Sequence, residues 1–122
     1  MRSPATTPSI DIDRNDQAVH DPRVATALQF IEFLSHGRRL SDHTSSNYQR
    51  DLHALFAVVP QIALEAFLPH HVRGAIARLH ARGEAPRTLA RRLSAWRSFF
   101  NWRVRHHVLS ANPAAGIRAP KI

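Results

Sequence analysis

The sequence contains no cysteine, and several other features that mark common protein classes are also missing. The lack of cysteine excludes disulfides and thiolate chemistry, and it is compatible with a reducing cytosol. No apolar run approaches the ~18–20 residues that span a bilayer. The first 20 residues have neither the basic start nor the apolar block of a signal peptide. At 122 residues, the chain has the size of one small domain with a modest core.

Residues that could carry catalysis or bind a metal are present, but their spacing does not form a site. The chain has nine histidines, yet it has no His-Glu-x-x-His motif, and adjacent pairs such as His70 and His71 point in different directions on a helix. The four glycines are isolated and form no glycine-rich phosphate loop. The serines of residues 35–46 lie near predicted helix ends, where capping explains them, and Tyr48 lies on an apolar stripe. We therefore expect no catalytic residue, metal or cofactor in this chain.

The positive charge is concentrated in one part of the sequence. The formal net charge is +8. Residues 1–40 carry five basic and five acidic side chains, whereas residues 73–105 carry nine arginines against Glu84 alone. The planar guanidinium group grips phosphate with two hydrogen bonds, so an excess that is almost all arginine favours an anionic polymer as partner. The charge pattern therefore predicts binding to nucleic acid, and the alternative is an ordinary solvated charged face.

Four segments show the periodicity of amphipathic helices and carry helix start and stop residues. They are residues 21–37, 41–59, 69–83 and 86–107, and residues 61–68 are expected to form a loop or a single turn. The residues expected to be buried in the first three helices are Ala27, Leu28, Ile31, Leu34, Tyr48, Leu52, Leu55, Val59, Val72, Ile76 and Leu79. No segment shows strand-like alternation. The sequence therefore predicts an all-α bundle of four helices.

The predicted helix at residues 86–107 has two faces of different chemistry. One face is an apolar stripe formed by Leu89, Leu93, Trp96, Phe100 and Val104. The opposite face carries only cationic and small hydrogen-bonding side chains, namely Arg87, Arg91, Ser94, Ser98, Asn101 and Arg105. The first face can enter a protein core, and the second suits a phosphate backbone. Phe99 and Trp102 lie off the centre of the stripe, which indicates either a wide buried face or a contact with a second domain or protomer.

The two ends of the chain differ in composition from the helical part. Residues 1–20 are polar and rich in Ser, Thr, Pro and Asp, so we expect a disordered leader. Residues 109–122 are punctuated by proline and glycine, and we expect them to be a linker toward a further domain, with a frayed tail as the alternative. The helical domain is then expected to cover residues 21–108.

Three segments match a known set of motifs. Residues 40–52 read Leu-Ser-Asp-His-Thr-Ser-Ser-Asn-Tyr-Gln-Arg-Asp-Leu and fit the pattern Leu-Ser-x-x-Thr-x-x-x-Tyr-x-x-Asp-Leu. Residues 89–102 read Leu-Ala-Arg-Arg-Leu-Ser-Ala-Trp-Arg-Ser-Phe-Phe-Asn-Trp, and Asn-Pro, Gly and Pro-Lys follow within residues 112–121. In this order and spacing, the segments resemble two helical signatures and the linker of tyrosine recombinases of the XerC/XerD type, with XerC closer than XerD. The resemblance covers residues 22–122.

The resemblance implies a fold and a set of site residues. The fold is the N-terminal core-binding domain, also called SAM-like, in which two crossed helical hairpins form half of a C-shaped clamp on DNA. In this family the second and fourth helices meet the major groove. The DNA contacts that the motifs carry over are His43, Thr44, Ser46, Asn47, Arg87, Thr88, Arg91 and Ser94. Helical phase agrees on Arg87, Arg91 and Ser94, adds Arg50, and places Thr44 and Thr88 toward the core. Arg103 departs from the family, which usually has an apolar residue there.

The resemblance also implies a function for the parent protein. The expected role is clamping a recombination site for strand exchange in chromosome dimer resolution, in the bacterial cytoplasm, with a XerD-like partner and synapsed protomers. The catalytic domain is expected to begin after Lys121 and so to lie outside this fragment, which we expect to be monomeric, to bind double-stranded DNA and to cleave nothing. The alternatives are the N-terminal domain of a phage or plasmid integrase, a free-standing helical DNA-binding regulator, and a bundle whose arginines meet an acidic protein.

Overall fold

The computed structural model describes residues 21–37, 41–106 and 108–121, and the predicted leader at residues 1–20 lies outside them. The elements are α2 (Pro22–Gly37), α3 (Asp42–Val58), the short 3₁₀ helix η2 (Leu64–Ala66), α4 (Pro69–Ala81) and α5 (Pro86–Arg105). Within the described ranges there is no strand, which confirms the predicted all-α fold of four helices. The single turn expected within residues 61–68 is η2, and α5 ends two residues before the predicted position.

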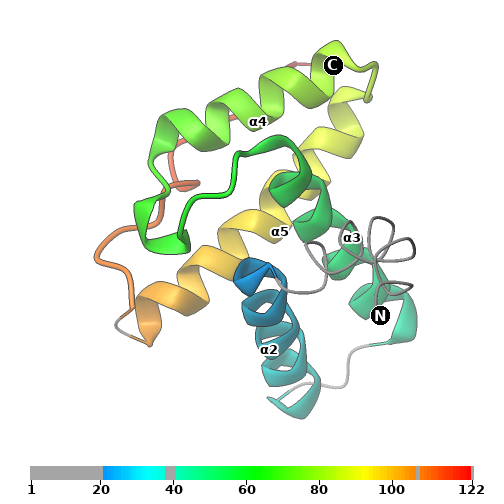
Figure 1. The fold of residues 1–122 in the computed structure, drawn as a ribbon. Helices are drawn as coiled ribbons and strands as arrows, with labels where there is room; N and C mark the ends of the chain where they lie inside the picture. The colour runs from blue at the N-terminus through cyan, green and yellow to red at the C-terminus, as the bar shows by residue number, and fades with distance from the viewer. Residues whose placement is uncertain (1–20, 38–40, 107, 122) are drawn as a thin grey trace, which may run out of the picture.

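The four helices pack as two hairpins, α2 with α3 and α4 with α5 (Figure 1). Helix α5 runs through the middle of the view, with α4 above it and α2 below it. Helices α3 and α5 are the centre of the packing, because each of them contacts all three other helices. The backbone on both sides of the α3–α5 junction is therefore held by contacts with all four helices.

Helix α5 supplies three of the four largest fully buried side chains. Trp96, Phe99 and Phe100 are fully buried, and Phe99 makes an edge-on contact with Phe30 of α2, with ring centroids 5.6 Å apart. Trp102 is half-buried, and its ring centroid lies 5.5 Å from that of Phe30. The wide buried face, one of two predicted explanations for Phe99 and Trp102, is thus confirmed. The opposite, polar face of α5 is exposed at all six predicted positions.

One predicted core residue is wrong. Leu28 is 46% exposed, whereas Ala27, Phe30 and Ile31 are buried and Leu34 is half-buried. The buried positions follow i, i+3, i+4 and i+7 spacing, and Leu28 lies about 100° around the helix from that row. Phe30, which the sequence pattern did not select, belongs to the buried row, and Leu28 does not.

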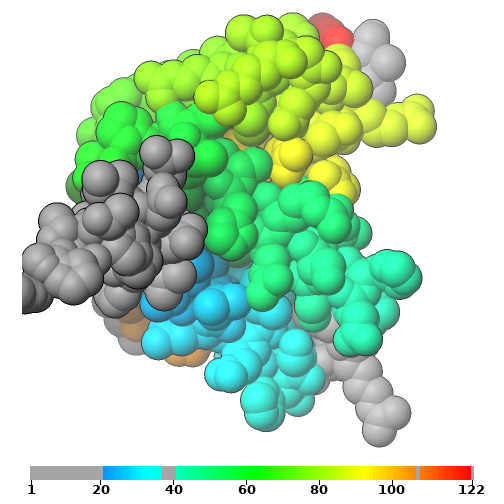
Figure 2. All heavy atoms as spheres, turned by 45° about the vertical axis from the view of Figure 1, so that its right-hand side comes forward, coloured from blue at the N-terminus to red at the C-terminus, as the bar shows by residue number. Residues whose placement is uncertain are grey.

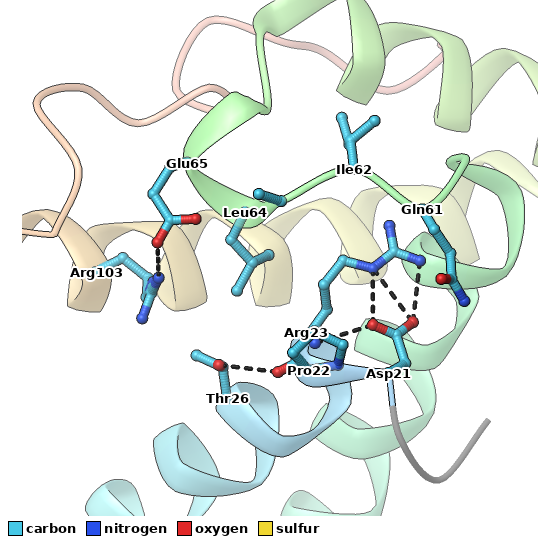
Figure 3. Close-up of a pocket in the computed structure, with 10 residues that line it drawn as sticks. Asp21, Pro22, Arg23, Thr26, Gln61, Ile62, Leu64, Glu65 and Arg103 are labelled. Atoms are coloured by element: carbon cyan, nitrogen blue, oxygen red, sulfur yellow. Dashed lines mark hydrogen bonds and ion pairs between the residues drawn. The ribbon is translucent and has the colours of Figure 1, made fainter. Parts of the chain in front are cut away.

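A buried ion pair fixes the start of α2 against the end of α3. The Asp21 carboxylate accepts hydrogen bonds from the backbone N–H of Arg23, at 2.9 Å, and from its guanidinium, at 3.0–3.2 Å (Figure 3). The same guanidinium donates to the carbonyls of Phe56, Val59 and Pro60. Burial alone raises the pKa of Asp21, but the hydrogen bonds and charge of Arg23 outweigh it and hold the pKa below its ordinary value.

Arg103, the departure from the family pattern, is accommodated by an ion pair. Its side chain is 12% exposed, and Nη2 lies 3.1 Å from Oε2 of Glu65 on η2 (Figure 3). Its Nε is buried without a partner among the described residues. The pair joins the end of α5 to the connection between α3 and α4.

The residues after α5 fold back on that helix. Ala114 and Ile117 are buried, and the Arg97 guanidinium donates to both of their carbonyls, at 3.2 Å in the case of Ala114. The Asn112 amide in turn donates to the Arg97 carbonyl at 3.1 Å and to Asn101 Oδ1 at 2.9 Å. The packed part of the chain therefore extends to Ile117, beyond the domain boundary expected at residue 108.

Candidate nucleic-acid interface

Helices α3 and α5 border an open groove of about 250 Å³. In Figure 2 the surface is hollowed between the teal atoms of α3 and the yellow atoms of α5. The residues that line the groove are Thr44, Asn47, Tyr48, Asp51, Arg91, Ser94, Ala95 and Ser98. Thr44, Asn47, Arg91 and Ser94 belong to the predicted set, so the fold brings together four site residues from two signatures that are separated in sequence.

The α3 side of the groove is built from the first turns of that helix. Ser41 caps the helix, as predicted, because its Oγ accepts a hydrogen bond from the Thr44 backbone N–H at 3.1 Å. Asn47 Oδ1 accepts a hydrogen bond from Arg50 Nη1 at 2.9 Å, which ties Arg50 to a groove residue. His43 and Ser46 are exposed on the same helix but are not among the residues that line the groove.

Two arginines lie on the α5 side, and they differ in whether they form an ion pair with a described residue. Arg87 is exposed in the first turn and forms no ion pair or side-chain hydrogen bond with any described residue. Arg91 is 43% exposed and lies 3.0 Å from a carboxylate oxygen of Asp51. Thr88 is half-buried, and so is Thr44 on α3, which confirms the inward phase predicted for both threonines.

Asp51 is the main feature that the predicted site residues do not include. It is 2% exposed, and its Oδ1 lies 3.0 Å from both Arg91 Nη2 and Arg92 Nη1. Arg92 also makes a two-point contact with Glu84, at 2.7 and 3.2 Å. The Asp51 backbone carbonyl accepts a 2.7 Å hydrogen bond from the Trp96 indole. The pKa of Asp51 is raised because burial disfavours its charged form, although the charges of Arg91 and Arg92 oppose that effect.

A signal in the sequence could have identified Asp51. It lies three residues after Tyr48 and four before Leu55, and therefore on the predicted buried stripe of α3. A carboxylate in such a position requires a charged partner. Helical phase alone could not say which arginine would supply it. Tyr48 itself is half-buried, packing edge-on against Phe30 while lining the groove.

The arginine-rich segment does not form one continuous cationic surface. Arg92 and Arg103 are paired with carboxylates. Arg78 donates to the Val58 carbonyl, and Arg97 holds the residues after α5. These side chains stabilise the fold, so the charge available to an anionic ligand is smaller than the composition indicates. Separately, no helix in the described parts of the chain has the length and hydropathy that a membrane span requires.

The sequence is similar to those of known tyrosine recombinases. Tyrosine recombinase XerC 1 of Ralstonia nicotianae is 39% identical over 116 residues, which is 91% of this chain and 34% of that protein. Tyrosine recombinase XerC of Ralstonia pickettii is 41% identical over 93% of this chain and 34% of that protein. Tyrosine recombinase XerC of Salmonella typhi is 42% identical over 76% of this chain and 32% of that protein. The chain thus spans about a third of the length of the curated relatives it matches. No solved structure matches it.

The family model for the phage integrase N-terminal SAM-like domain matches residues 27–107. That range contains α3, α4, α5 and both walls of the groove. By this match the chain belongs to the family of phage integrase N-terminal SAM-like domains.

Proposed function

We propose that this chain is the DNA-binding, core-binding part of a XerC-type site-specific tyrosine recombinase. The observation that carries the proposal is the groove, because it places Thr44 and Asn47 of α3 beside Arg91 and Ser94 of α5. Hydroxyl, amide and guanidinium groups are the side chains that donate to DNA phosphates and base edges. The exposed Arg87, Arg50, His43 and Ser46 and the half-buried Thr88 extend the same chemistry beyond the groove.

The proposed role within a recombinase is to clamp the recombination site during strand exchange, in the bacterial cytoplasm. The matching family model is that of an N-terminal SAM-like domain, and DNA binding is the activity we assign to this chain. The proposed context is chromosome dimer resolution with a XerD-like partner, and the proposed state of this chain alone is a monomer. A phage or plasmid integrase is the second candidate parent, because the matching family model is that of phage integrases.

The test is duplex binding measured by fluorescence anisotropy across a salt series. One labelled duplex carries a XerC-type recombination site, the other has the same composition in scrambled order, and unlabelled heparin is the competitor. If five phosphates are contacted, the slope of log affinity against log salt will be about −4.5, at ~0.9 per contact. We expect this steep slope and tighter binding to duplex than to heparin. No binding to either duplex at low salt, or equal binding to heparin, would contradict the proposal.

A further inference from the structure

We propose that Asp51 is a positioning residue that withholds Arg91 from DNA phosphates and holds it for contact with a base edge. The inference rests on the proposed function and deepens it. It starts from an unusual combination: the only carboxylate that lines the described groove is also among the most deeply buried polar groups of the domain. A buried acid at a DNA-binding surface opposes phosphate binding, so its presence needs a reason.

Four charged side chains at the α3–α5 junction compensate one another. Asp51 and Glu84 supply two negative charges, and Arg91 and Arg92 supply two positive charges. At neutral pH the four side chains sum to zero when both acids are ionised. The groove is therefore less attractive to an undirected phosphate than its two adjacent arginines indicate.

The two arginines that share Asp51 are not equivalent. Arg92 is 12% exposed and contacts the carboxylates of both Asp51 and Glu84, so it holds the Asp51 carboxylate in place. Arg91 is 43% exposed and lines the groove, and its Nη2 lies 3.0 Å from Asp51 Oδ1. A guanidinium has five N–H donors. Arg91 can therefore stay paired with Asp51 and still offer other donors to a ligand in the groove.

A base edge and a phosphate would affect the Arg91–Asp51 pair differently. Guanine presents two acceptors in the major groove that a guanidinium can contact bidentately. A neutral base edge of this kind does not require Arg91 to leave Asp51. A phosphate competes with Asp51 for the same charge, and drawing Arg91 away leaves a buried carboxylate with less compensation, which is costly. Asp51 thus favours contacts that read sequence over contacts that only bind the backbone.

The deciding variant is Asp51→Asn, which keeps the shape of the side chain and removes its charge. The matched control is Glu84→Gln, which removes one negative charge from the same network at the carboxylate that contacts Arg92 and not Arg91. Both proteins are measured with the site duplex and the scrambled duplex, across salt. For Asp51→Asn we expect tighter binding to the scrambled duplex, a salt slope steeper by about one unit, and a site preference reduced at least fivefold. Glu84→Gln should show less than half of each change.

Several outcomes would overturn the inference without touching the proposed function. In each, the wild type binds duplex DNA. The contradicting results are that Asp51→Asn leaves the salt slope unchanged, that it weakens binding to both duplexes equally, or that its effects on slope and site preference are no larger than those of Glu84→Gln. A wild type that binds both duplexes equally would also overturn it. A wild type that binds no duplex contradicts the proposed function instead.

A second pair of variants keeps the inference testable if Asp51→Asn does not fold. Arg91→Gln and Arg87→Gln remove the same charge from neighbouring turns of α5, and only Arg91 is paired with Asp51. We expect Arg91→Gln to flatten the salt slope by less than half as much as Arg87→Gln does, and to reduce the site preference at least fivefold. Equal effects of the two substitutions on slope and preference would overturn the inference.

Discussion

Arg23 shows what a buried guanidinium requires in a domain of this size. Its side chain is 4% exposed, and taking such a charge out of water costs several kcal/mol unless its donors are satisfied. Asp21 and three carbonyls at the end of α3 accept its hydrogen bonds, and the Phe56 ring lies 5.0 Å from the guanidinium carbon. The Asp21–Arg23 pair therefore joins the start of α2 to the end of α3.

Asp21→Asn should destabilise the fold, because Arg23 would lose its counter-charge. We expect a loss of about 3 kcal/mol at pH 7, the lower end for a broken buried pair, since the three carbonyls remain. The folded-state pKa of Asp21 lies below its ordinary value, so its stabilisation is present above the unfolded pKa and is lost as pH falls through the folded one. The difference from wild type should shrink between pH 7 and pH 3.

Urea denaturation at the two pH values measures this difference. Asp42→Asn is the control, because Asp42 is an exposed carboxylate in the first turn of α3 with no ion pair among the described residues. A loss of stability for Asp21→Asn that is the same at pH 7 and pH 3 would contradict the assignment of the effect to charge.

At the scale of elements, the segment after α5 packs against that helix. The Arg97 guanidinium donates to two carbonyls of this segment, those of Ala114 and Ile117. The Asn112 amide donates in the opposite direction, to the Arg97 carbonyl. Asn112 Oδ1 also accepts from the Ala114 backbone N–H at 2.8 Å, which shapes the turn that places Ile117 in the core. Composition could not reveal this, because a proline- and glycine-punctuated stretch is typical of linkers as well.

Ile117→Ala distinguishes a packed segment from a linker. Removing a buried isoleucine side chain typically costs 2–5 kcal/mol, and we expect about 2 kcal/mol here because the site lies at the edge of the core. Thermal unfolding followed by circular dichroism measures it, with Arg118→Ala, at an exposed neighbouring position, as the control. If Ile117→Ala and Arg118→Ala melt with the wild type, the segment does not stabilise the domain.

At the scale of the whole molecule, much of the fold follows from local sequence, and part of the site does not. Helix positions, the Ser41 cap and the large core residues of α5 are predictable because periodicity and capping are properties of short segments. The rotation of α2, which exposes Leu28, depends on where α3 and α5 present their own side chains. The pairing of Asp51 with Arg91 and Arg92 depends on the meeting of α3 and α5, and Asp51 and Arg92 are 41 residues apart in sequence. No local pattern specifies that meeting.

The location of the interface on the molecule can be tested with two arginines of one helix face. Arg87 and Arg105 are both exposed, but they lie at opposite ends of α5, about 27 Å apart at 1.5 Å per residue. This separation is well beyond the ~8 Å screening length at physiological salt. Arg87→Gln should flatten the salt slope of duplex binding by about one unit, and Arg105→Gln should change it by much less. Equal effects would place the DNA along the whole of α5 rather than at the α3–α5 groove.

Trp96 gives the domain an internal optical reporter. Its indole is fully buried and donates to the backbone carbonyl of Asp51, so it lies directly beneath the groove. A buried indole emits at shorter wavelength than a hydrated one, and Trp102, the second tryptophan, is half-buried and packs against Phe30 and Phe33 of α2. Emission from a protein in which Trp102 is replaced by phenylalanine would therefore report on the α3–α5 junction alone, without any attached dye.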